Sequence, residues 1–399
     1  MFNVKALLES HGNEVIPFSV HSDRNEPTEY DRYFVEPIGG RSAVYYEDYK
    51  KTPRNIWKMF ARSVYSLEVK RALKREICDV KPDIVYVLQC INKLSPSVIR
   101  AAKQMGVPVV YRLSDYQLMC PKFDFLRGTD VCEECMHKGL VCAIRHRCVK
   151  GSLAASMVRV FAMRFQRMIR IYDDVDAYVT PSAFLRDKMI EAGFRADMIH
   201  HIPTFTRRDV AGDASGSDAA QAGSYGLYVG RIAAQKDLDT VIKAYELLPD
   251  HKLMIVGDDT SDEARILKEY ISSRKMTNVE FTGFRSGKEL EDTIRGSRFQ
   301  IMPSIWYENL PNSALESMLY GKPLIASDIG SLRELVDDGV NGYLYEPRNH
   351  TELADRIRKM DDDARVTAMG EQCLLKMRET FSPEAHYTDL FNLFSNLVS

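Results

Sequence analysis

Short apolar runs alternate along the whole chain with segments in which apolar residues recur every three or four positions. Buried strands alternating with amphipathic helices give this pattern, so the sequence predicts a parallel α/β fold. The expected strands of the first half are 14–19, 84–88, 107–112, 177–180 and 198–202. Those of the second half are 225–229, 252–256, 279–282, 299–302, 323–326 and 342–345.

Between the two sets of strands, residues 209–224 are mostly small or acidic and offer little to bury. Such a composition is typical of a flexible linker. It predicts an N-terminal domain over 1–208 and a C-terminal domain over 225–382. The last segment, 383–399, has the period of an amphipathic helix, and we expect it to pack back on the N-terminal domain.

The composition, 45% hydrophobic and 28% charged, is that of a soluble globular protein. No run of 18 or more apolar residues occurs, and the first residues lack the apolar core of a signal peptide. We therefore expect a cytoplasmic location. There, the eight cysteines would be thiols or metal ligands rather than disulfides.

The net charge of -2 is unevenly distributed. Residues 1–208 hold 33 Lys/Arg and 24 Asp/Glu, a balance of +9, whereas 209–399 hold 21 and 32, a balance of -11. Basic stretches at 54–75 and 135–172 suit the inner face of a membrane or a lipid-diphosphate acceptor. Solvated helix faces are the alternative, and the absence of a nucleic-acid-reading motif argues against a nucleic-acid partner.

Two carboxylates flank a predicted strand-to-helix connection in the second half. A strand ends near Met302, and a helix begins near Pro311, where free backbone amides face the carboxyl edge of the sheet. Glu308 lies in the loop and Glu316 about one turn inside the helix. The pair can bind hydroxyl groups at opposite ends of one elongated ligand, although Glu316 alone also suits an exposed helix position.

Two cations, Arg231 and Lys236, follow a strand that ends at Gly230. A diphosphate requires such charge-assisted donors, although surface cations are the commoner explanation of a short string like this one. Gly257 and Gly283 end the next two expected strands. Both positions suit the edge of a pocket for a nucleotide base.

In order and spacing, these residues resemble family-4 glycosyltransferases of the GT-B fold. The matching segments are 229–236, 256–257, 281–283, the pair Glu308 and Glu316, 321–330 and 340–344. The resemblance implies two Rossmann-like parallel-sheet domains. It also implies transfer of a sugar, with retention, from a nucleotide-diphosphate-sugar donor to a polysaccharide or lipid-linked glycan acceptor. No catalytic metal or other cofactor is implied.

The resemblance also implies a role for each matched residue. Arg231 and Lys236 would bind the diphosphate, after the close backbone approach that Gly230 allows. Glu308 would hold the donor sugar, with the amides of Asn309 and Leu310 nearby, and Glu316 would hold the ribose. Gly283, Phe284 and Arg285 would flank the base, in the pocket whose edge Gly257 also suits. The alternative functions are an impaired or inactive sugar-nucleotide-binding homologue, a sugar-nucleotide epimerase and a glycan phosphorylase. The spacing of the two glutamates disfavours the epimerase, and no cofactor-lysine motif supports the phosphorylase. A dehydrogenase would need a Gly-x-Gly-x-x-Gly turn after a strand, which the sequence lacks.

The N-terminal half departs from the family pattern in two ways. Relatives begin with a strand and a Gly-rich loop, whereas this sequence begins within the following helix, near Val4. We therefore expect an incomplete N-terminal domain without that strand and loop. Ser114 stands where many relatives carry histidine, and its hydroxyl is no acid or base near neutral pH. Asp115 is a candidate for an acceptor or active-site contact, with a helix N-cap as the alternative.

Five cysteines lie close together in a loop over 120–148: Cys120, Cys132, Cys135, Cys142 and Cys148. The two-residue spacing between Cys132 and Cys135 lets both thiolates face one tetrahedral ion. A structural zinc held by four of the five is the preferred interpretation. Buried free thiols or a redox pair are the alternatives.

Overall fold

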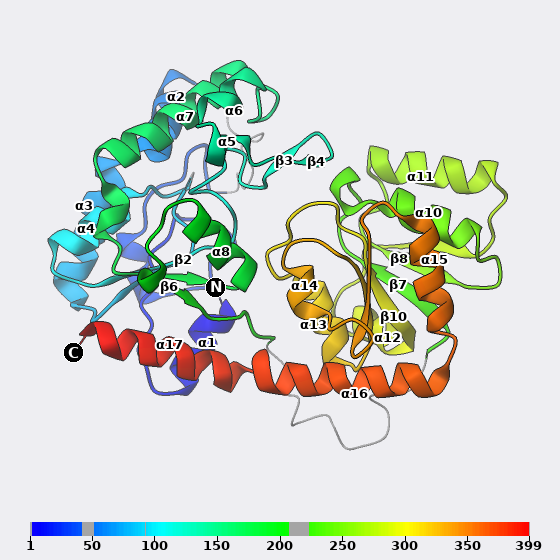
Figure 1. The fold of residues 1–399 in the computed structure, drawn as a ribbon. Coiled ribbons are helices and arrows are strands. Elements are labelled where there is room, and N and C mark those ends of the chain that lie inside the picture. Colours follow the sequence, from blue (N-terminus) through cyan, green and yellow to red (C-terminus); the bar gives the residue numbers. More distant parts are fainter. Residues whose placement is uncertain (1, 42–51, 92, 207–222, 399) are drawn as a thin grey trace.

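The computed structural model describes residues 2–41, 52–91, 93–206 and 223–398. Two α/β domains lie side by side, each built on a parallel sheet with helices on its faces (Figure 1). The predicted linker falls almost wholly outside the described residues. Among the described helices, none combines the length and apolar character needed to cross a bilayer.

The N-terminal sheet has the strand order β1-β2-β5-β6, and every pairing in it is parallel. Its strands are β1 (Val85–Val87), β2 (Val109–Arg112), β5 (Ala177–Thr180) and β6 (Ile199–His201). Each lies within a predicted range. These runs are apolar on both faces, and a strand between two helical layers buries both faces. An antiparallel hairpin of β3 (Leu126–Arg127) and β4 (Asp130–Val131) projects from the same domain.

The strand expected at 14–19 is wrong. The structure forms only an isolated parallel bridge between Val20 and Val35 in this region. Pro17 lies in the middle of the run and has no backbone N–H to donate to a ladder. The pairing is therefore confined to the bonds around Ser19, His21 and Val35.

Helices of the N-terminal domain begin where serine or threonine side chains can accept a backbone N–H. Thr52, Ser66, Ser152 and Ser182 each accept the amide three residues later. The helices are α1 (Phe2–Ser10), η1 (Glu29–Tyr33), α2 (Pro53–Val64), α3 (Leu67–Val80), α4 (Ser97–Gln104), α5 (Glu134–His137), α6 (Val141–Arg145), α7 (Leu153–Met168), η3 (Ile171–Asp174), α8 (Ala183–Glu191) and η4 (Ala196–Met198).

The C-terminal sheet has the order β12-β11-β10-β7-β8-β9, again wholly parallel. Its strands are β7 (Tyr225–Val229), β8 (Leu253–Val256), β9 (Val279–Gly283), β10 (Ser297–Met302), β11 (Leu324–Ser327) and β12 (Gly342–Tyr345). The chain winds outward from β7 in one direction and then from β10 in the other. Open α/β sheets bind their ligands outside the carboxyl ends of the strands at such a reversal point.

Helices cover both faces of this sheet. Two long helices follow one another along the lower side of the molecule, residues 363–380 beneath the C-terminal domain and 383–398 beneath the N-terminal domain (Figure 1). The helices are η5 (Ala234–Lys236), α10 (Leu238–Glu246), α11 (Asp262–Ser273), α12 (Gly287–Gly296), α13 (Asn312–Leu319), α14 (Leu332–Leu335), α15 (His350–Lys359), α16 (Asp363–Thr380) and α17 (Pro383–Val398).

Helix α17 packs against the N-terminal domain rather than the domain from which it emerges. Leu390 is fully buried in one apolar cluster with Val110 of β2 and Val179 of β5. The ring of Tyr387 stacks on His11 with centroids 3.6 Å apart. Burial of this apolar face ties the end of the chain to the N-terminal sheet and limits the relative movement of the two domains.

A second contact between the domains is made at the start of helix α8. The Glu334 carboxylate of α14 accepts hydrogen bonds from the amides of Ala183 and Phe184, at 2.8 and 2.6 Å. These amides are free donors at the start of α8, where the helix dipole favours an anion. One domain therefore caps a helix of the other.

Candidate functional site

The loop after β10 carries a buried carboxylate. Glu308 is only 6% exposed, and three donors converge on its Oε1. Ser304 Oγ donates at 2.5 Å and Trp306 Nε1 at 2.8 Å, and Lys236 Nζ forms an ion pair with the same oxygen. A carboxylate removed from water is stable only with such partners. Lys236 and Glu308, which the sequence analysis assigned to the diphosphate and to the sugar, therefore meet at the reversal point of the sheet.

The backbone of this loop is held from two sides. Ser331 Oγ donates to the Glu308 carbonyl at 2.7 Å and accepts the Leu310 amide at 3.0 Å. The Tyr116 hydroxyl of the N-terminal domain also donates to the Glu308 carbonyl, at 3.4 Å. Leu310 adopts the left-handed conformation at φ 60°. Its amide, an expected contact of the donor sugar, is therefore already bound by Ser331.

Asn309 connects the loop to the N-terminal domain. Its Oδ1 accepts a hydrogen bond from Ser182 Oγ at 2.9 Å, while its Nδ2 is buried without a partner within the described residues. A buried amide N–H without an acceptor destabilises the folded protein, because it has lost its hydrogen bonds to water. This donor is therefore available to a ligand with an oxygen at that position.

The second cation lies close to the pair. Arg231 is exposed, and its carbonyl accepts a hydrogen bond from the Tyr228 hydroxyl at 2.7 Å. Burial raises the pKa of Tyr228; the Glu308 carboxylate raises it further, and Arg231 lowers it. Both charges therefore act on one tyrosine at the end of β7. Lys236 and Glu308 thus meet directly, and the Arg231 backbone is bonded to the same strand end through Tyr228.

The predicted glycines lie next to one another at the carboxyl ends of β7, β8 and β9. The Gly257 amide donates to the Gly283 carbonyl at 3.1 Å. A Cβ on Gly257 would stand 2.2 Å from the Gly230 carbonyl oxygen, and Gly283 has φ 76°. Glycine is therefore required at this edge, and the backbone presents little bulk to a ligand.

The expected base contacts are less uniform. Phe284 is 77% exposed, directly after Gly283. Arg285 turns toward α12, where Nη1 donates to Thr293 Oγ1 at 2.7 Å and Nε lies 3.3 Å from Glu289. Phe284 thus offers a free aromatic face, whereas the Arg285 guanidinium is already engaged.

Glu316 lies beyond the loop, in a cleft of about 550 Å³ between the domains. The cleft is also lined by Asn309 and Leu310 from the C-terminal domain and by Arg112 and Ser114 from the N-terminal domain. Arg112 donates to Ser114 Oγ and Thr204 Oγ1, at 3.5 and 2.6 Å. Glu316 thus shares this cleft with Asn309 and Leu310, the two residues that follow Glu308.

Asp115 makes local contacts. Its Oδ1 accepts the Gln117 amide at 2.9 Å and its Oδ2 the Gln89 side chain at 3.5 Å, and burial raises its pKa. Residues 114–119 form turns rather than an α-helix, so the carboxylate closes a turn instead of capping a helix.

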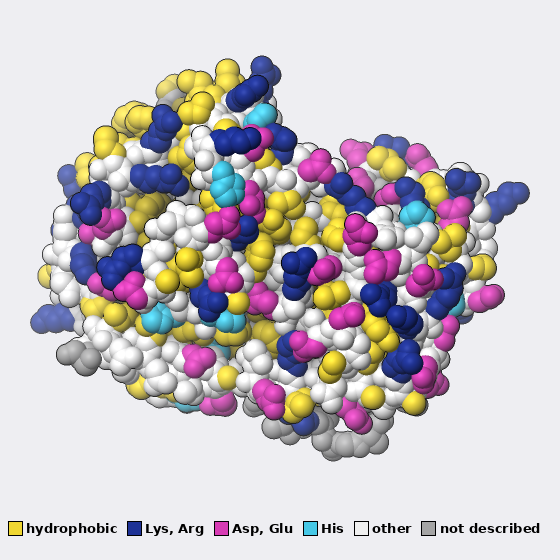
Figure 2. Space-filling view, viewed as in Figure 1, with side chains coloured by type: hydrophobic (Ala, Val, Ile, Leu, Met, Phe, Trp, Pro, Cys, Tyr) yellow, Lys and Arg dark blue, Asp and Glu magenta, His cyan; other side chains and the backbone are white. Residues whose placement is uncertain are grey.

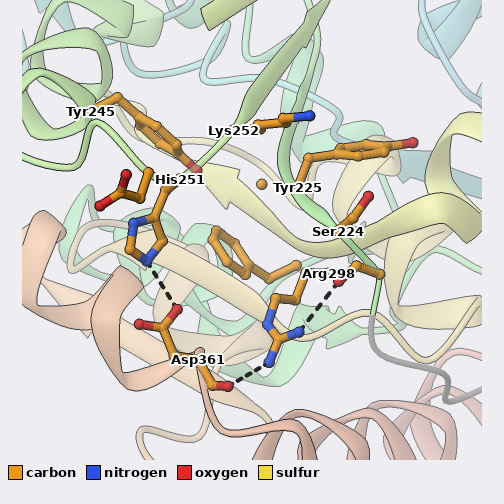
Figure 3. A pocket seen from close by; sticks show the side chains of 11 residues that line it. Ser224, Tyr225, Tyr245, His251, Lys252, Arg298 and Asp361 are labelled. Carbon is orange, nitrogen blue, oxygen red and sulfur yellow. Dashed lines mark hydrogen bonds and ion pairs between the residues drawn. The ribbon is translucent and has the colours of Figure 1, made fainter. Parts of the chain in front are cut away.

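A second pocket, of about 310 Å³, lies at the opposite end of the C-terminal sheet (Figure 3). It is lined by Tyr225 and Lys252 at the starts of β7 and β8, and by Asp361. His251 and Arg298 are both bonded to Asp361, at 2.9 and 2.8 Å. Three of its charged groups are thus bonded to one another, and the pocket is not part of the site at the carboxyl edge.

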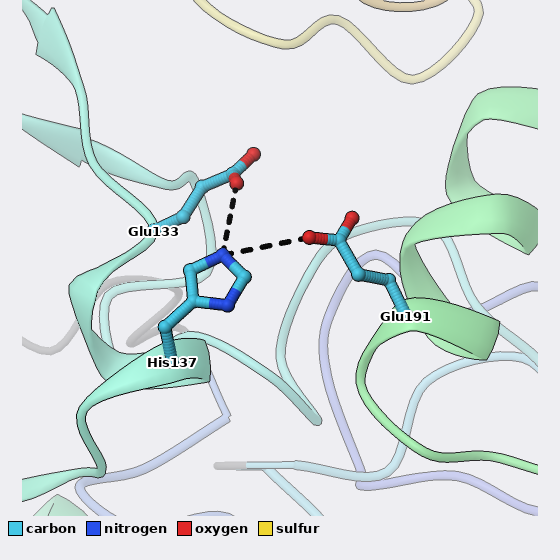
Figure 4. Close-up of side chains that lie close together, drawn as sticks. All are labelled: Glu133, His137 and Glu191. Carbon is cyan, nitrogen blue, oxygen red and sulfur yellow. Dashed lines mark hydrogen bonds and ion pairs between the residues drawn. The ribbon is translucent and has the colours of Figure 1, made fainter.

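Potential metal ligands gather at one place among the described residues. The one group of three whose ligand atoms all lie within 4.8 Å of one another is Glu133, His137 and Glu191 (Figure 4). Lys188 Nζ lies 2.7 Å from Glu133 and 2.9 Å from Glu191, so a lysine already neutralises these carboxylates.

The five predicted cysteine ligands do not form such a group. Burial, followed by the charges of Cys120, Cys148 and Cys142, raises the pKa of Cys135 to about 12. These four thiols are therefore neighbours, and Cys132 acts on Cys148. Their sulfur atoms are nevertheless too far apart for the closed shell of a tetrahedral ion, in which thiolates lie about 3.8 Å from one another.

The sequence did not single out several residues that hold the site. Ser304, Trp306 and Ser331 fix the Glu308 loop, and Tyr116 and Ser182 reach it from the other domain. Trp306, two positions before Glu308, was the one detectable signal. Nothing in the sequence pairs Tyr116 or Ser182 with a loop more than 120 residues away.

Comparison with known proteins agrees with this geometry. Residues 219–378 match the family described as "Glycosyl transferases group 1". The chain is 23% identical over 353 residues to an uncharacterized 42.6 kDa protein in the cps region of Klebsiella pneumoniae, covering 86% of this chain and 85% of that one. It is 33% identical over 142 residues to the alpha-D-kanosaminyltransferase of Streptomyces kanamyceticus, covering 34% and 36%.

Solved structures share the fold. A glycosyltransferase from Rickettsia africae superposes with a TM-score of 0.68 at 16% identity, covering 100% of this chain and 94% of that one. Anabaena Alr3699/HepE in complex with UDP and glucose gives 0.58 at 20% identity, covering 82% of each. The two parallel-sheet domains therefore have the GT-B fold that the sequence predicted. The C-terminal domain matches the group 1 glycosyl transferases over residues 219–378, and the chain is a transferase, as the sequence predicted.

A double-mutant cycle tests the buried pair. The cycle compares the free energies of unfolding of the wild type, Lys236→Met, Glu308→Gln and the double variant. We expect a coupling free energy of about 1–3 kcal/mol, because the lysine amine binds the carboxylate where both are removed from water. Urea unfolding of the four proteins measures it.

The exposed pair Lys243 and Asp239, at 2.7 Å on α10, is the matched control. Its coupling should stay near about 0.3–0.5 kcal/mol. A coupling between Lys236 and Glu308 no larger than that of the control would contradict the buried arrangement.

Proposed function

We propose that this enzyme transfers a sugar, with retention, from a nucleotide-diphosphate-sugar donor to a polysaccharide or lipid-linked glycan acceptor. The observation that carries the proposal is the buried Glu308 carboxylate paired with Lys236 at the reversal point of the sheet. A buried ion pair with Arg231 beside it, at the edge where such sheets bind nucleotides, suits a ligand with hydroxyl groups and a diphosphate.

The donor would exchange partners within this cluster. Its diphosphate would take Lys236 and Arg231, and the sugar hydroxyls would donate to the Glu308 carboxylate as Lys236 leaves it. Asn309 Nδ2, buried without a partner among the described residues, offers a further donor to a sugar oxygen. Glu316 would accept the two ribose hydroxyls from the cleft. The complex of Anabaena Alr3699/HepE with UDP and glucose supports a uridine nucleotide as the first candidate.

The chemical step requires stabilisation of separating charges. Cleavage of the bond between the anomeric carbon and the diphosphate oxygen leaves negative charge on the diphosphate and positive character on the sugar ring. Arg231, Lys236 and the start of α13 would stabilise the leaving group, and fixed charges of this kind account for most of the rate enhancement in many enzymes. This account uses side-chain cations and no catalytic metal. Retention follows from the family resemblance.

The acceptor would enter the interdomain cleft beside Arg112 and Ser114. An anionic glycan or a lipid diphosphate suits Arg112. A relative in the cps region of Klebsiella pneumoniae and a TarM complex that contains alpha-GlcNAc-glycerol support a cell-envelope acceptor. The basic N-terminal half would hold the enzyme at the inner face of the membrane.

A donor-binding homologue with impaired transfer is the second candidate. Ser114, at the position of a family histidine, lines the cleft and brings no acid or base to it. The two candidates differ in transfer to acceptor, not in donor binding. Measurement of both on the same protein separates them.

Replacement of Arg231 tests the donor assignment. We expect Arg231→Ala to lose about 2–4 kcal/mol of transition-state stabilisation, or about 10²–10³ in the rate of donor turnover, because a cation beside the diphosphate is removed. Release of the nucleoside diphosphate from a panel of nucleotide sugars measures it.

Lys275→Ala, an exposed cation on the same domain, is the control and should keep the wild-type rate. Turnover by Arg231→Ala at the control rate would refute the assignment.

The cysteine loop would hold a structural zinc through four of Cys120, Cys132, Cys135, Cys142 and Cys148. The thiols that lie near Cys135 support this proposal. Their sulfur atoms would have to move closer together when the zinc ion binds. Protein purified without added zinc should contain about one equivalent of metal, because four thiolates bind zinc tightly. Less than about a tenth of an equivalent, with all five thiols titrating, would favour free thiols instead.

A further inference from the structure

An exposed apolar surface covers the outer faces of α2 and α7. Trp57 is 68% exposed, Phe161 50% and Met168 71%. Their neighbours Ile56, Leu153 and Met157 are about half exposed as well. Figure 2 shows apolar side chains gathered at the upper left of the molecule, where Figure 1 draws α2 and α7. We call this the α2–α7 surface.

The surface is continuous across the two helices. Trp57 stacks on Phe60, Phe60 on Phe161, and Phe161 on Phe165, with ring centroids 5.8, 5.9 and 6.2 Å apart. Gln166 of α7 donates to the carbonyls of Ser63 and Val64 at the end of α2, which fixes the helices side by side. A soluble protein seldom leaves so large an apolar patch without a partner.

The two helices of this surface carry cations and no carboxylate. Neither α2 nor α7 contains an acidic residue, and none occurs between Cys135 and Tyr172. Exposed cations on the two helices and the turns around them include Arg54, Arg145, Arg147, Lys150, Arg164 and Arg167. Acids on the segments that flank the two helices are paired with cations: Glu68 of α3 lies 3.7 and 3.5 Å from Lys58 and Arg62, and Asp173 of η3 accepts a hydrogen bond from Arg170.

An apolar surface with cations around it favours a lipid bilayer over a second copy of the chain as its partner. Two copies of the chain meeting through the surface would bring their arginines together, and no acidic side chain could offset the repulsion. Anionic lipid supplies both complements, since its headgroups attract cations and its acyl region accepts tryptophan and other apolar side chains. We propose that the α2–α7 surface docks on an anionic bilayer, with Trp57, Met157, Phe161 and Met168 inserted at the interface.

The inner face of α7 connects this surface to the cleft. Arg159 donates to the Gln117 carbonyl at 3.0 Å, and Arg167 to the Leu118 carbonyl at 3.2 Å. The same turn carries Tyr116, which donates to the Glu308 carbonyl. Docking would thus set the cleft at a fixed height above the membrane. Its use in presenting a lipid-linked acceptor rests on the proposed function, whereas docking itself does not.

Cosedimentation with vesicles tests the proposal. The wild-type protein should pellet with phosphatidylcholine vesicles that contain phosphatidylglycerol, and much less with phosphatidylcholine alone. The double variant Trp57→Ser/Phe161→Ser should lose about ten-fold or more in partitioning, because two half-exposed aromatic side chains no longer insert. Arg164→Glu should lose about 30-fold, since each unit of charge near an anionic surface contributes about five-fold.

Matched controls lie on the C-terminal domain. Ile266→Ser removes an apolar side chain that is 53% exposed on α11, and Lys275→Glu reverses an exposed charge. Both should bind vesicles as the wild type does. Circular dichroism and release of nucleoside diphosphate without vesicles verify that every variant is folded.

Two results would overturn the proposal. One is equal binding of the wild-type protein to neutral and anionic vesicles, or none to either. The other is a dimer that the double variant abolishes in sedimentation velocity while vesicle binding stays unchanged, which would assign the surface to a second copy. Donor turnover without vesicles reports on the proposed function separately, so a failure of one leaves the other standing.

Discussion

The buried contact between Lys236 and Glu308 is the interaction on which the site depends. It joins the loop after β7 to the loop after β10. These neighbouring strands are the point from which the chain adds strands outward in opposite directions. Desolvated charges are stable only while each has a partner, so the pair holds the Glu308 loop in one position. A ligand that supplies hydroxyl groups for the carboxylate and phosphate for the amine could replace this contact without leaving either charge unpaired.

The rest of the architecture presents that loop to the second domain. Tyr116 and Ser182 of the N-terminal domain bond to residues 308 and 309, and Glu334 caps α8 in return. Helix α17 buries Leu390 in the N-terminal sheet and so limits how far the domains separate. The loop that we propose as the donor site is therefore contacted directly by the domain proposed to hold the acceptor.

Much of this could be predicted because buried strands require continuous apolar runs. The bounds of β5, β7 and β12 equal the expected ones, and the glycines at 230, 257 and 283 mark strand ends where a Cβ or a negative φ would not fit. The strand expected at 14–19 was wrong because Pro17 interrupts the ladder. Arg62 illustrates the other limit. It was counted in a basic helix face, yet it is buried and donates to the carbonyls of Lys93 and Glu36. Periodicity cannot reveal such long-range partners.

A crystal structure of the enzyme with a bound nucleoside diphosphate sugar tests the central claim most directly. The account predicts that Lys236 Nζ leaves Glu308 and lies, with Arg231, within hydrogen-bonding distance of the diphosphate, while the Glu308 carboxylate accepts hydroxyl groups of the sugar. A donor bound elsewhere, with the contact between Lys236 and Glu308 unchanged, would contradict it.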